Sequence, residues 1–362
     1  MSTGPVLIMA GGTGGHVFPA LALARVLRQR SLEVIWLGTR RGLEARVVPA
    51  ERIRIEWLSV GGLRGKGLAT LLAAPFRLAL ALMQALRVMR RHRPAAVVGL
   101  GGFVTGPGGI AAWLTRRPLI IHEQNAVAGF TNRCLAHFAR EVLEAFPGSF
   151  GKRVHARAIG NPVRQEILDT PQPRARFAAR SGAIRVLVIG GSQGAARLNS
   201  IVPLALSRLG TRLALEVRHQ AGPRWHEATQ RSYASAGVAA QVLPFIDDMA
   251  AAYAWADLVI CRSGALTVSE LAAAGVGAVL VPFPAAVDDH QTSNARYLVD
   301  AAAAVLIPES ELTAERLAAE LEQLCADRGR LLVMAERART LARPHAADEL
   351  AQACLEVAER AA

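Results

Sequence analysis

The sequence predicts an α/β protein made of two doubly wound, Rossmann-like domains that face a central cleft. Short apolar runs of four to six residues alternate with amphipathic helical stretches along the chain, a pattern typical of βαβ units with parallel sheets. A strand, a glycine-rich loop and a helix open the chain, and the same order returns about half a chain later. The length of 362 residues suffices for two domains that each have their own core.

The apolar runs give the expected strands. In the first half they are VLIMA (6–10), EVIWLG (33–38), AAVVGLGG (95–102) and RPLIIHEQN (117–125). In the second half they are IRVLVIGG (184–191), LALEVRHQ (213–220), DLVICR (257–262) and GAVLVPF (277–283). The helices expected between them include Leu21–Arg30, Ala265–Ala274 and Leu312–Ala326.

A proline-containing connector marks the expected domain boundary. The stretch AIGNPVRQEILDTPQPR (158–174) carries an Asn-Pro pair and two further prolines, which favour a turn or linker. We therefore expect one domain over residues 1–163 and a second over residues 164–340. Residues 341–362 are expected to form a helix that packs back toward the first domain.

Basic residues are concentrated in the first half of the chain. Residues 1–150 hold 19 Lys and Arg against 7 Glu and no Asp, whereas residues 151–362 hold 23 basic and 22 acidic residues. This asymmetry predicts an anionic partner for the first half: a membrane face, a phosphorylated lipid or a nucleic acid. The alternative is a generic surface whose Arg content reflects codon usage, since 40 of the 42 basic residues are Arg. The four scattered cysteines form no zinc or disulfide pattern and no signal peptide is expected, so a reducing compartment is predicted.

The first glycine loop, GGTGGH (11–16), is interpreted as an anion-binding turn. It matches neither the G-x-G-x-x-G dinucleotide fingerprint nor the Walker A pattern, and the second loop, GGSQG (190–194), fails in the same way. Small residues still let backbone N–H groups and a helix N-terminus approach an anion. His16 opens the following helix, where a neutral imidazole can act as a general base. The alternative is a His that caps the loop or contacts a phosphate.

Two further motifs of the first half follow expected strands. The loop GLGGFVTGPGG (99–109) offers a second anion cradle. The motif HEQN (122–125) places Glu123 and Asn125 at the same edge of the sheet. Hydrogen bonding within the loop is the alternative role for HEQN.

In the second half, the stretch with the most candidate binding residues is CRSGALTVSELAAAG (261–275). Residues 263–267 are expected to open a helix whose N–H groups bind a diphosphate, and Glu270 is expected to bind the hydroxyls of a ribose. Thr267 and Glu270 also fit a capping box, which is the alternative.

Polar residues also follow the next expected strand of the second half. His290, Gln291 and Asn294 are candidates for reading the hydroxyls of a sugar. The chain has no D-x-D motif, which would hold a metal and a diphosphate. We therefore expect dipoles and Arg164 to meet the charge of a leaving diphosphate.

The segment from 62 to 94 is mostly apolar before it becomes basic. Its last residues include Arg90, Arg91 and Arg93. A membrane-spanning helix fits the length, but Pro75 and Arg77 interrupt it. We therefore expect a helix with one face in the core and another on a lipid surface, and a purely buried core helix is the alternative.

These motifs together resemble the MurG family, the UDP-N-acetylglucosamine–N-acetylmuramyl-(pentapeptide) pyrophosphoryl-undecaprenol N-acetylglucosamine transferases. In family order the chain carries GGTGGHVFPALALA, GLRGKG, GGFVTGPGG, HEQN, GNPVR, GGSQGA, FIDDMAAAYAWADLVICRSGALTVSELAAAG and DDHQTSNA. The resemblance covers essentially the whole chain and implies a GT-B glycosyltransferase fold. It implies an inverting, metal-independent transfer of GlcNAc from UDP-GlcNAc to the C4 hydroxyl of the muramyl sugar of lipid I, which gives lipid II for peptidoglycan.

The resemblance also implies roles for domains and residues. Residues 1–163 would bind the acceptor and the membrane, and residues 164–340 would bind the donor. His16 is the implied base and Glu123 a helper. The residues implied for the donor are Thr13, Gly14, Gly15, Asn125, Arg164, Ser192, Ile246, Ala265, Leu266, Thr267, Val268, Ser269, Glu270 and Gln291. Those implied for the acceptor are Gly102, Phe103, Thr105, Gly106 and Gly108.

The resemblance implies no metal and no cofactor. The implied partners are UDP-GlcNAc, lipid I, an anionic phospholipid surface and other cell-wall synthesis proteins, at the cytoplasmic face of the inner membrane as a peripheral protein. Phe103 stands where some family members carry Tyr, so no hydroxyl donor is expected in that loop.

Three other functions are weighed against this one. A UDP-GlcNAc 2-epimerase would share the fold but needs no lipid surface, so residues 66–93 argue against it. A nucleic-acid binder would account for the charge, but the chain is only 5% aromatic and carries no RRM, KH or zinc pattern. An NAD dehydrogenase is disfavoured by the failed dinucleotide fingerprint.

Overall fold

The structure, a computed structural model, describes residues 4–61, 74–191, 194–284 and 289–360. The chain divides into two compact units. The N-terminal unit comprises Met1–Arg164 and Arg343–Ala362, and the C-terminal unit comprises Gln165–Ala342. Each unit has its own parallel sheet and its own hydrophobic core.

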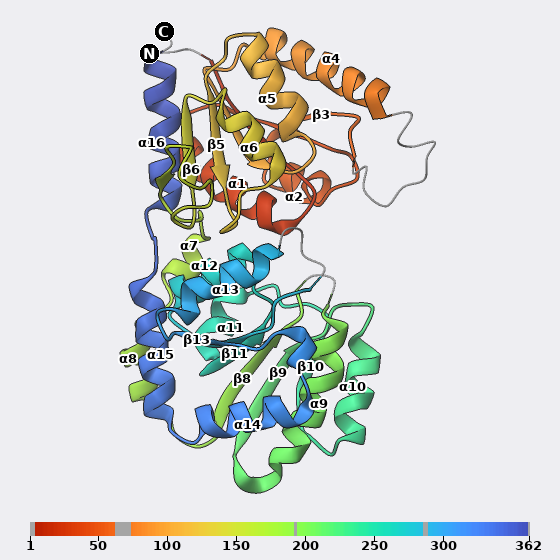
Figure 1. Ribbon diagram of the computed structural model, residues 1–362, viewed down its shortest axis with the longest axis vertical. Coiled ribbons are helices and arrows are strands. Elements are labelled where there is room, and N and C mark those ends of the chain that lie inside the picture. Colours follow the sequence, from red (N-terminus) through yellow and green to blue (C-terminus); the bar gives the residue numbers. More distant parts are fainter. Residues whose placement is uncertain (1–3, 62–73, 192–193, 285–288, 361–362) are drawn as a thin grey trace. The chain divides into compact units, whose positions relative to one another are not determined.

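The described residues of the N-terminal unit form a seven-stranded sheet with the order β3-β2-β1-β4-β5-β6-β7 (Figure 1). The strands are β1 (Val6–Ala10), β2 (Val34–Gly38), β3 (Arg54–Trp57), β4 (Ala96–Gly101), β5 (Leu119–Glu123), β6 (Glu141–Glu144) and β7 (Arg157–Ala158). The helices are α1 (Gly14–Gln29), α2 (Glu44–Ala50), α4 (Ala74–His92), α5 (Thr105–Leu114), α6 (Phe130–Ala136) and α16 (Ala346–Glu359). The strand order reverses between β1 and β4, so the loops that leave these two parallel neighbours lie side by side.

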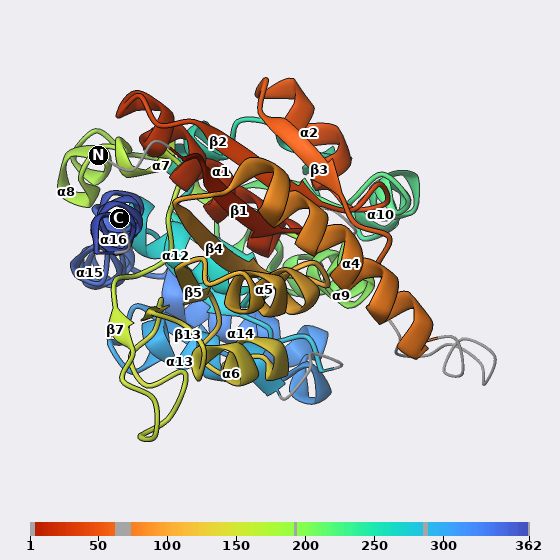
Figure 2. The ribbon, with the colours of Figure 1, turned by 90° about the horizontal axis from the view of Figure 1, so that it is seen from above.

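The two faces of this sheet are buried under different helices. Along β1, Ile8 belongs to one hydrophobic cluster while its neighbours Leu7 and Met9 belong to another, because successive side chains of a strand point to opposite faces. The first cluster includes Leu350 and Cys354 of α16. On the other face α4, α5 and α6 lie in a row, as Figure 2 shows.

The last helix of the chain completes the N-terminal unit. α16 packs on α1 and β4, and Figure 1 shows it in blue beside strands of the first part of the chain. Two ion pairs tie it down: Arg30 to Asp348 at 2.8 Å and Arg157 to Glu349 at 3.3 Å. Residues from both ends of the chain therefore share one core.

The segment expected to be an amphipathic helix is described in part. Residues 62–73 lie outside the described residues, and α4 covers Ala74–His92, two residues short of the end of the segment. α4 buries Ala81, Ala85 and Met89, whereas Phe76 is 79% exposed. Within the described residues no helix combines the length and the apolar character needed to cross a membrane.

The described residues of the C-terminal unit form a six-stranded parallel sheet with the order β10-β9-β8-β11-β12-β13. The strands are β8 (Ile184–Ile189), β9 (Leu215–Gln220), β10 (Gln241–Leu243), β11 (Leu258–Cys261), β12 (Gly277–Leu280) and β13 (Ala304–Leu306). The α-helices are α7 (Gln165–Leu168), α8 (Pro173–Ala178), α9 (Ala196–Leu209), α10 (His226–Ser235), α11 (Met249–Trp255), α12 (Ala265–Ala274), α13 (His290–Val299), α14 (Ala314–Cys325) and α15 (Arg328–Thr340). The order reverses between β8 and β11, so the glycine loop after β8 neighbours the stretch that opens α12.

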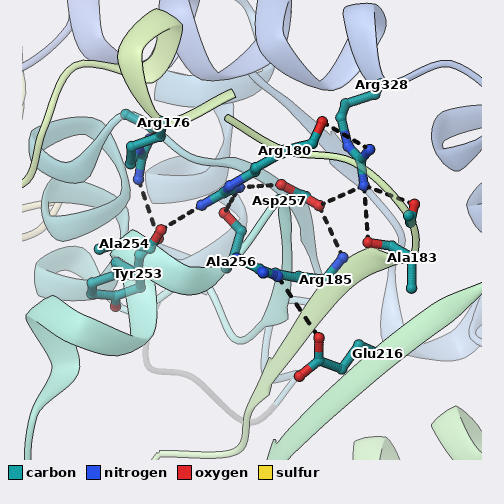
Figure 3. A network of polar contacts seen from close by, with 12 residues as sticks. Arg176, Arg180, Ala183, Arg185, Glu216, Tyr253, Ala254, Ala256, Asp257 and Arg328 are labelled. Atoms are coloured by element: carbon teal, nitrogen blue, oxygen red, sulfur yellow. Dashed lines mark hydrogen bonds and ion pairs between the residues drawn. The ribbon is translucent and has the colours of Figure 1, made fainter. Parts of the chain in front are cut away.

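A buried carboxylate organises the start of the C-terminal sheet (Figure 3). Asp257, fully buried just before β11, forms an ion pair with Arg180 and a second, at 3.5 Å, with Arg328. It also accepts a hydrogen bond of 3.0 Å from the backbone N–H of Arg185. Arg176 of α8 donates to the carbonyl oxygens of Tyr253, at 3.2 Å, and Gly275. Arg176 and Arg180 thus fix α8 and the segment between α8 and β8 to this unit.

Candidate functional site

Two glycine loops of the N-terminal unit interlock at the carboxyl edge of its sheet. A Cβ placed on Gly102, whose φ is +83°, would lie 2.3 Å from the carbonyl oxygen of Gly11. A Cβ on Gly101, whose φ is +112°, would lie 2.6 Å from the ring of His16. Neither position has room for a side chain, and both need the backbone conformation that glycine adopts readily. The loop after β4 therefore packs directly against the loop after β1, with the imidazole of His16 at the contact.

A buried carboxylate supports the first of these loops. Glu44, fully buried at the start of α2, accepts a hydrogen bond of 2.9 Å from the backbone N–H of Gly12. Its other oxygen accepts from the backbone N–H and the hydroxyl of Thr39, at 2.9 and 2.7 Å. A Cβ on Gly42 would lie 1.9 Å from this carboxylate. Glu44 was not predicted from the sequence, although an acidic residue that follows a strand and a glycine is a usable signal.

His16 is connected to the HEQN motif. Its Nδ1 lies 2.8 Å from Oε1 of Gln124, a residue that the sequence analysis did not single out. Nε2 of Gln124 lies 3.0 Å from Nδ1 of His122, and Nε2 of His122 lies 2.9 Å from the carbonyl oxygen of Gly160. Burial lowers the pKa of His122 to about 4, so this ring is neutral near pH 7.

Glu123, the implied helper, is occupied within its own loop. One carboxylate oxygen accepts from the backbone N–H and the side-chain amide of Asn125, at 2.9 and 3.1 Å. The other accepts from the backbone N–H of Gly129 at 3.1 Å and from the amide of Asn132 at 2.8 Å. The side chain is 2% exposed. These contacts match the alternative role of hydrogen bonding within the loop, and they orient Asn125.

The residues implied for the acceptor fall into two groups. Phe103 is 56% exposed and lies with Gly102 at the rim of the loop, and Gly106 is half-buried. Thr105 is fully buried, and its hydroxyl donates to the carbonyl oxygen of Gly101 at 2.9 Å. A Cβ on Gly108 would lie 2.3 Å from Sδ of Met9. The structure thus uses Thr105 and Gly108 to hold the loop and α5 against the sheet.

A hollow of about 800 Å³ opens beside these loops in the N-terminal unit. Thr13 and Phe103 line it together with cationic and aromatic residues from the β2–α2 loop, the end of β3 and the start of α4. These additional residues include Arg40, Arg41, Trp57 and Arg77. The guanidinium of Arg40 lies 5.3 Å from the ring centroid of Trp57. Cations beside apolar surface suit an anionic ligand that also has an apolar part.

The remaining donor candidates of the N-terminal unit lie at its loop ends. Thr13 is the exposed N-cap residue of α1, and Gly14 and Gly15 form the first turn. Their backbone N–H groups belong to a helix N-terminus, which favours an anion. Arg164 is the last residue of the first segment of this unit, and its guanidinium lies 5.6 Å from the ring centroid of Phe18.

In the C-terminal unit the structure corrects the capping-box reading. α12 begins at Ala265 with Gly264 as its N-cap, so Thr267 lies inside the first turn and cannot be the N-cap residue. Glu270 is 7% exposed, and one of its oxygens accepts a hydrogen bond of 3.0 Å from the hydroxyl of Tyr253. The backbone N–H groups of residues 265–267 lie at the open N-terminus of the helix, as a diphosphate site requires, whereas that of Val268 donates to the carbonyl oxygen of Gly264 at 2.9 Å.

The other predicted donor residues of this unit are only partly brought together. Gln291, in the first turn of α13, accepts a hydrogen bond of 3.0 Å from the backbone N–H of Phe283. The amide of Asn294 donates to the carbonyl oxygen of Ser263, at 3.2 Å, which joins α13 to the stretch before α12. Ile246 is half-buried in the loop after β10, and Ser192 lies outside the described residues.

Comparison with known families covers both units. Residues 6–144 match the glycosyltransferase family 28 N-terminal domain, and residues 185–350 match the glycosyltransferase family 28 C-terminal domain. These matches define the class of protein as a glycosyltransferase. A protein of Nitrosococcus oceani, 60% identical over 353 residues, spans 98% of each chain and is named UDP-N-acetylglucosamine–N-acetylmuramyl-(pentapeptide) pyrophosphoryl-undecaprenol N-acetylglucosamine transferase. A protein of Alkalilimnicola ehrlichii with the same name is 60% identical over 356 residues, which is 98% of this chain and 99% of its own.

Solved structures give the same result. The crystal structure of MurG from Acinetobacter baumannii is 43% identical, has a TM-score of 0.85, and spans 98% of this chain and 99% of its own. The chain belongs to the MurG family of N-acetylglucosaminyltransferases, and the predicted GT-B fold is confirmed. A UDP-GlcNAc 2-epimerase from Neisseria meningitidis, 12% identical with a TM-score of 0.68 over 97% of this chain and all of its own, shares the fold alone.

Proposed function

We propose that the protein transfers N-acetylglucosamine from UDP-GlcNAc to the C4 hydroxyl of the muramyl sugar of an undecaprenyl-pyrophosphoryl-MurNAc-pentapeptide. The names of relatives at 60% identity support this choice of donor and acceptor. The structural observation that carries the proposal is the position of His16, whose ring packs against the second glycine loop where the two glycine loops meet.

In this proposal His16 is the general base. It removes the proton of the acceptor hydroxyl, whose oxygen forms a bond to C1 of the sugar while the bond from C1 to the UDP oxygen breaks. The electron pair of that bond leaves with UDP, and a single displacement inverts the configuration at C1. General-base assistance of this kind contributes about a hundredfold to ten-thousandfold in rate.

The two units divide the substrates. The N-terminal unit takes the lipid-linked acceptor: its glycine loops meet the pyrophosphate, and the hollow beside Thr13, with Arg40 and Arg41, suits an anionic amphiphile. The C-terminal unit takes UDP-GlcNAc, with its diphosphate at the N-terminus of α12 and its ribose at Glu270. Backbone N–H groups and Arg164 meet the charge of departing UDP, so the transfer needs no metal ion.

An assay of UDP release tests this proposal. Protein in chelator-treated buffer should release UDP from UDP-GlcNAc only when a water-soluble lipid I analogue is present. His16→Ala should lower kcat by about a hundredfold or more while the affinity for UDP-GlcNAc stays nearly unchanged. A large loss of donor affinity would make His16 a ligand of the donor. Interconversion of UDP-GlcNAc without an acceptor would point to an epimerase.

We further propose that the protein works as a peripheral protein on an anionic membrane, at the cytoplasmic face where nucleotide sugars are available. Exposed apolar side chains on the packed helices α4 and α5 support a lipid-facing surface. They are Phe76, Leu78, Leu80, Met83, Ile110, Trp113 and Leu114.

Basic residues lie at the end of α4 and just before the N-terminal ends of three strands of the sheet. Arg90 and Arg91 lie in the last turn of α4, and Arg93, Arg117 and Arg140 precede β4, β5 and β6. Each such cation near an anionic leaflet contributes roughly 1 kcal/mol. Replacing Arg90, Arg91 and Arg93 with Gln should therefore weaken binding to anionic vesicles. Unchanged binding would place the membrane surface elsewhere.

A further inference from the structure

Three buried or half-buried side chains form a series that ends at His16. His122 is fully buried and Gln124 is 1% exposed. The series runs from the carbonyl oxygen of Gly160 through His122 and Gln124 to Nδ1 of His16, with steps of 2.9, 3.0 and 2.8 Å. The direction of each hydrogen bond decides which nitrogen of His16 carries a proton.

Two main-chain carbonyl groups fix that direction because a carbonyl oxygen can only accept. Gly160 faces Nε2 of His122, so this nitrogen carries the proton of the neutral ring and Nδ1 is an acceptor. Nε2 of Gln124 lies 2.9 Å from the carbonyl oxygen of His122 as well as 3.0 Å from Nδ1 of His122. Both hydrogens of the Gln124 amide are therefore used on His122, and its orientation does not depend on His16.

The remaining atom of the Gln124 amide is an acceptor. Its Oε1 faces Nδ1 of His16, so Nδ1 must be the nitrogen that donates. In a neutral imidazole the proton on Nδ1 leaves the lone pair on Nε2. His16 is thereby held in the one neutral tautomer that can accept a proton at Nε2.

The backbone that anchors the series is itself fixed. Gly160 has a φ of +89°, and a Cβ there would lie 2.3 Å from Cβ of Arg343. The amide of Asn161 donates to the carbonyl oxygen of Gln124 at 3.1 Å. The acceptor at the start of the series therefore cannot turn away without displacing the segment that leads into α16.

We propose that Gln124 and His122 are positioning residues that set the tautomer and the orientation of His16. They act through His16 and touch no reacting atom. The inference rests on the proposed function, because it gives His16 the role of base. Because the group beside Nδ1 of His16 is the uncharged amide of Gln124, it orients the imidazole without placing a negative charge next to it.

The main test is Gln124→Met, which keeps the volume and removes both hydrogen-bonding groups. With a water-soluble acceptor analogue, kcat should fall by about ten- to a hundredfold, as is usual when an orienting partner is lost, while KM for UDP-GlcNAc stays unchanged. Gln352→Met is the matched control, because the exposed Gln352 of α16 loses only its contacts to Arg30, at 3.4 Å, and Glu356, at 3.3 Å, away from this series. The control should keep the kcat of the parent protein.

Two further variants separate positioning from a structural effect. Gln124→Glu keeps an acceptor beside His16 and adds a negative charge, so it should move the acidic limb of the pH profile to higher pH, while kcat stays low because the second carboxylate oxygen loses both hydrogen bonds to His122. His122→Phe keeps the carbonyl group that orients Gln124, so it should lose less than Gln124→Met, about two- to fivefold. Equal losses in all three variants, with no movement of the pH profile, would overturn the proposal.

NMR spectroscopy can determine the tautomer of His16 directly, without an activity assay. Nitrogen chemical shifts of 15N-histidine-labelled protein, assigned with His16→Gln, should report the Nδ1–H tautomer of His16 in the parent and a mixture in Gln124→Met. An Nε2–H tautomer in the parent would overturn the proposal. Because this measurement uses the resting protein, a chain with the expected tautomer and no transferase activity would contradict the proposed function and leave the positioning intact.

Discussion

The imidazole of His16 occupies the space that a side chain at position 101 would need, since a Cβ on Gly101 would lie 2.6 Å from its Nδ1. Gly101→Ala should therefore push the ring off the Gln124 amide and strain a backbone with φ +112°. We expect kcat to fall at least tenfold and the protein to lose about 1–3 kcal/mol of stability. Steady-state kinetics and urea denaturation measure both. Gly129→Ala, where a Cβ would have its nearest contact at 4.0 Å, is the control and should behave like the parent.

Glu44 should prove essential to the first glycine loop. Glu44→Gln turns one oxygen into an NH2 group that faces the N–H groups of Gly12 or Thr39, so a buried donor loses its acceptor. The expected cost is about 1–3 kcal/mol of stability, with a lower kcat because the loop carries His16. Glu51→Gln, which breaks only the exposed pair with Arg25, should cost less than about 1 kcal/mol. Equal costs in thermal denaturation would contradict the supporting role of Glu44.

Glu270 should determine donor affinity. If its carboxylate binds the ribose, Glu270→Gln should raise KM for UDP-GlcNAc several-fold with a smaller change in kcat, because a uniform binding contact is weakened. Tyr253→Phe removes the hydroxyl that Glu270 accepts from, and it should change KM less. An unchanged KM in Glu270→Gln, together with lower stability, would assign Glu270 to the packing of α11 on α12 instead.

Asp257 should be a major determinant of the stability of the C-terminal unit. Asp257→Asn leaves the buried guanidinium of Arg180 without its counterion, and breaking a buried pair in this way costs about 3–5 kcal/mol. Glu216→Gln is the control, since it removes only an exposed partner of Arg185 at 3.7 Å. Urea denaturation followed by tryptophan fluorescence measures both variants. A loss below about 1 kcal/mol in Asp257→Asn would show that the network is dispensable.

The protein should become less stable on mild acidification. Burial lowers the pKa of His122 to about 4 and that of His219 to about 3, from an ordinary value of 6.5. Between these values and 6.5 the unfolded chain binds the protons and the folded chain does not, so stability is complete above pH 6.5 and falls as the pH drops. From pH 7.5 to 5.5 each residue should cost about 1.4 kcal/mol. Urea midpoints at the two pH values test this, and a flat profile would contradict the neutral buried rings.

Much of the fold could be predicted from local patterns. The eight expected strands are all present, and most of them are apolar runs that a doubly covered parallel sheet buries on both faces, whereas β9 keeps Glu216 exposed. Five further strands were not expected from the sequence: β3, β6, β7, β10 and β13. β3 (Arg54–Trp57) and β7 (Arg157–Ala158) are the two edge strands of the N-terminal sheet, where side chains are exposed or half-buried and polar residues are tolerated.

The candidate site was only half predictable. The glycine loops could be predicted because tight turns and close packing of one backbone segment on another require glycine. His16 could be predicted as a site residue because it directly follows such a loop. Gln124 and Glu44 were missed, since an amide or a carboxylate becomes significant only through what lies opposite it in space. The capping-box alternative for Thr267 is excluded because α12 begins at Ala265, as the expected helix Ala265–Ala274 does, three residues before the start that an N-cap at Thr267 would require.

The sequence by itself determined the class of fold, the repeated strand–loop–helix pattern, the basic character of the first half and the family, because these follow from composition, period and ordered motifs. Only the tertiary structure decided which residues of α16 enter the core beside β1, that Thr105 and Gly108 support their loop, and that His16 faces Gln124. These contacts join residues that lie up to several hundred positions apart in the sequence. Hydrogen bonds and packing depend on which residues are close in space, and a local sequence pattern does not contain that information.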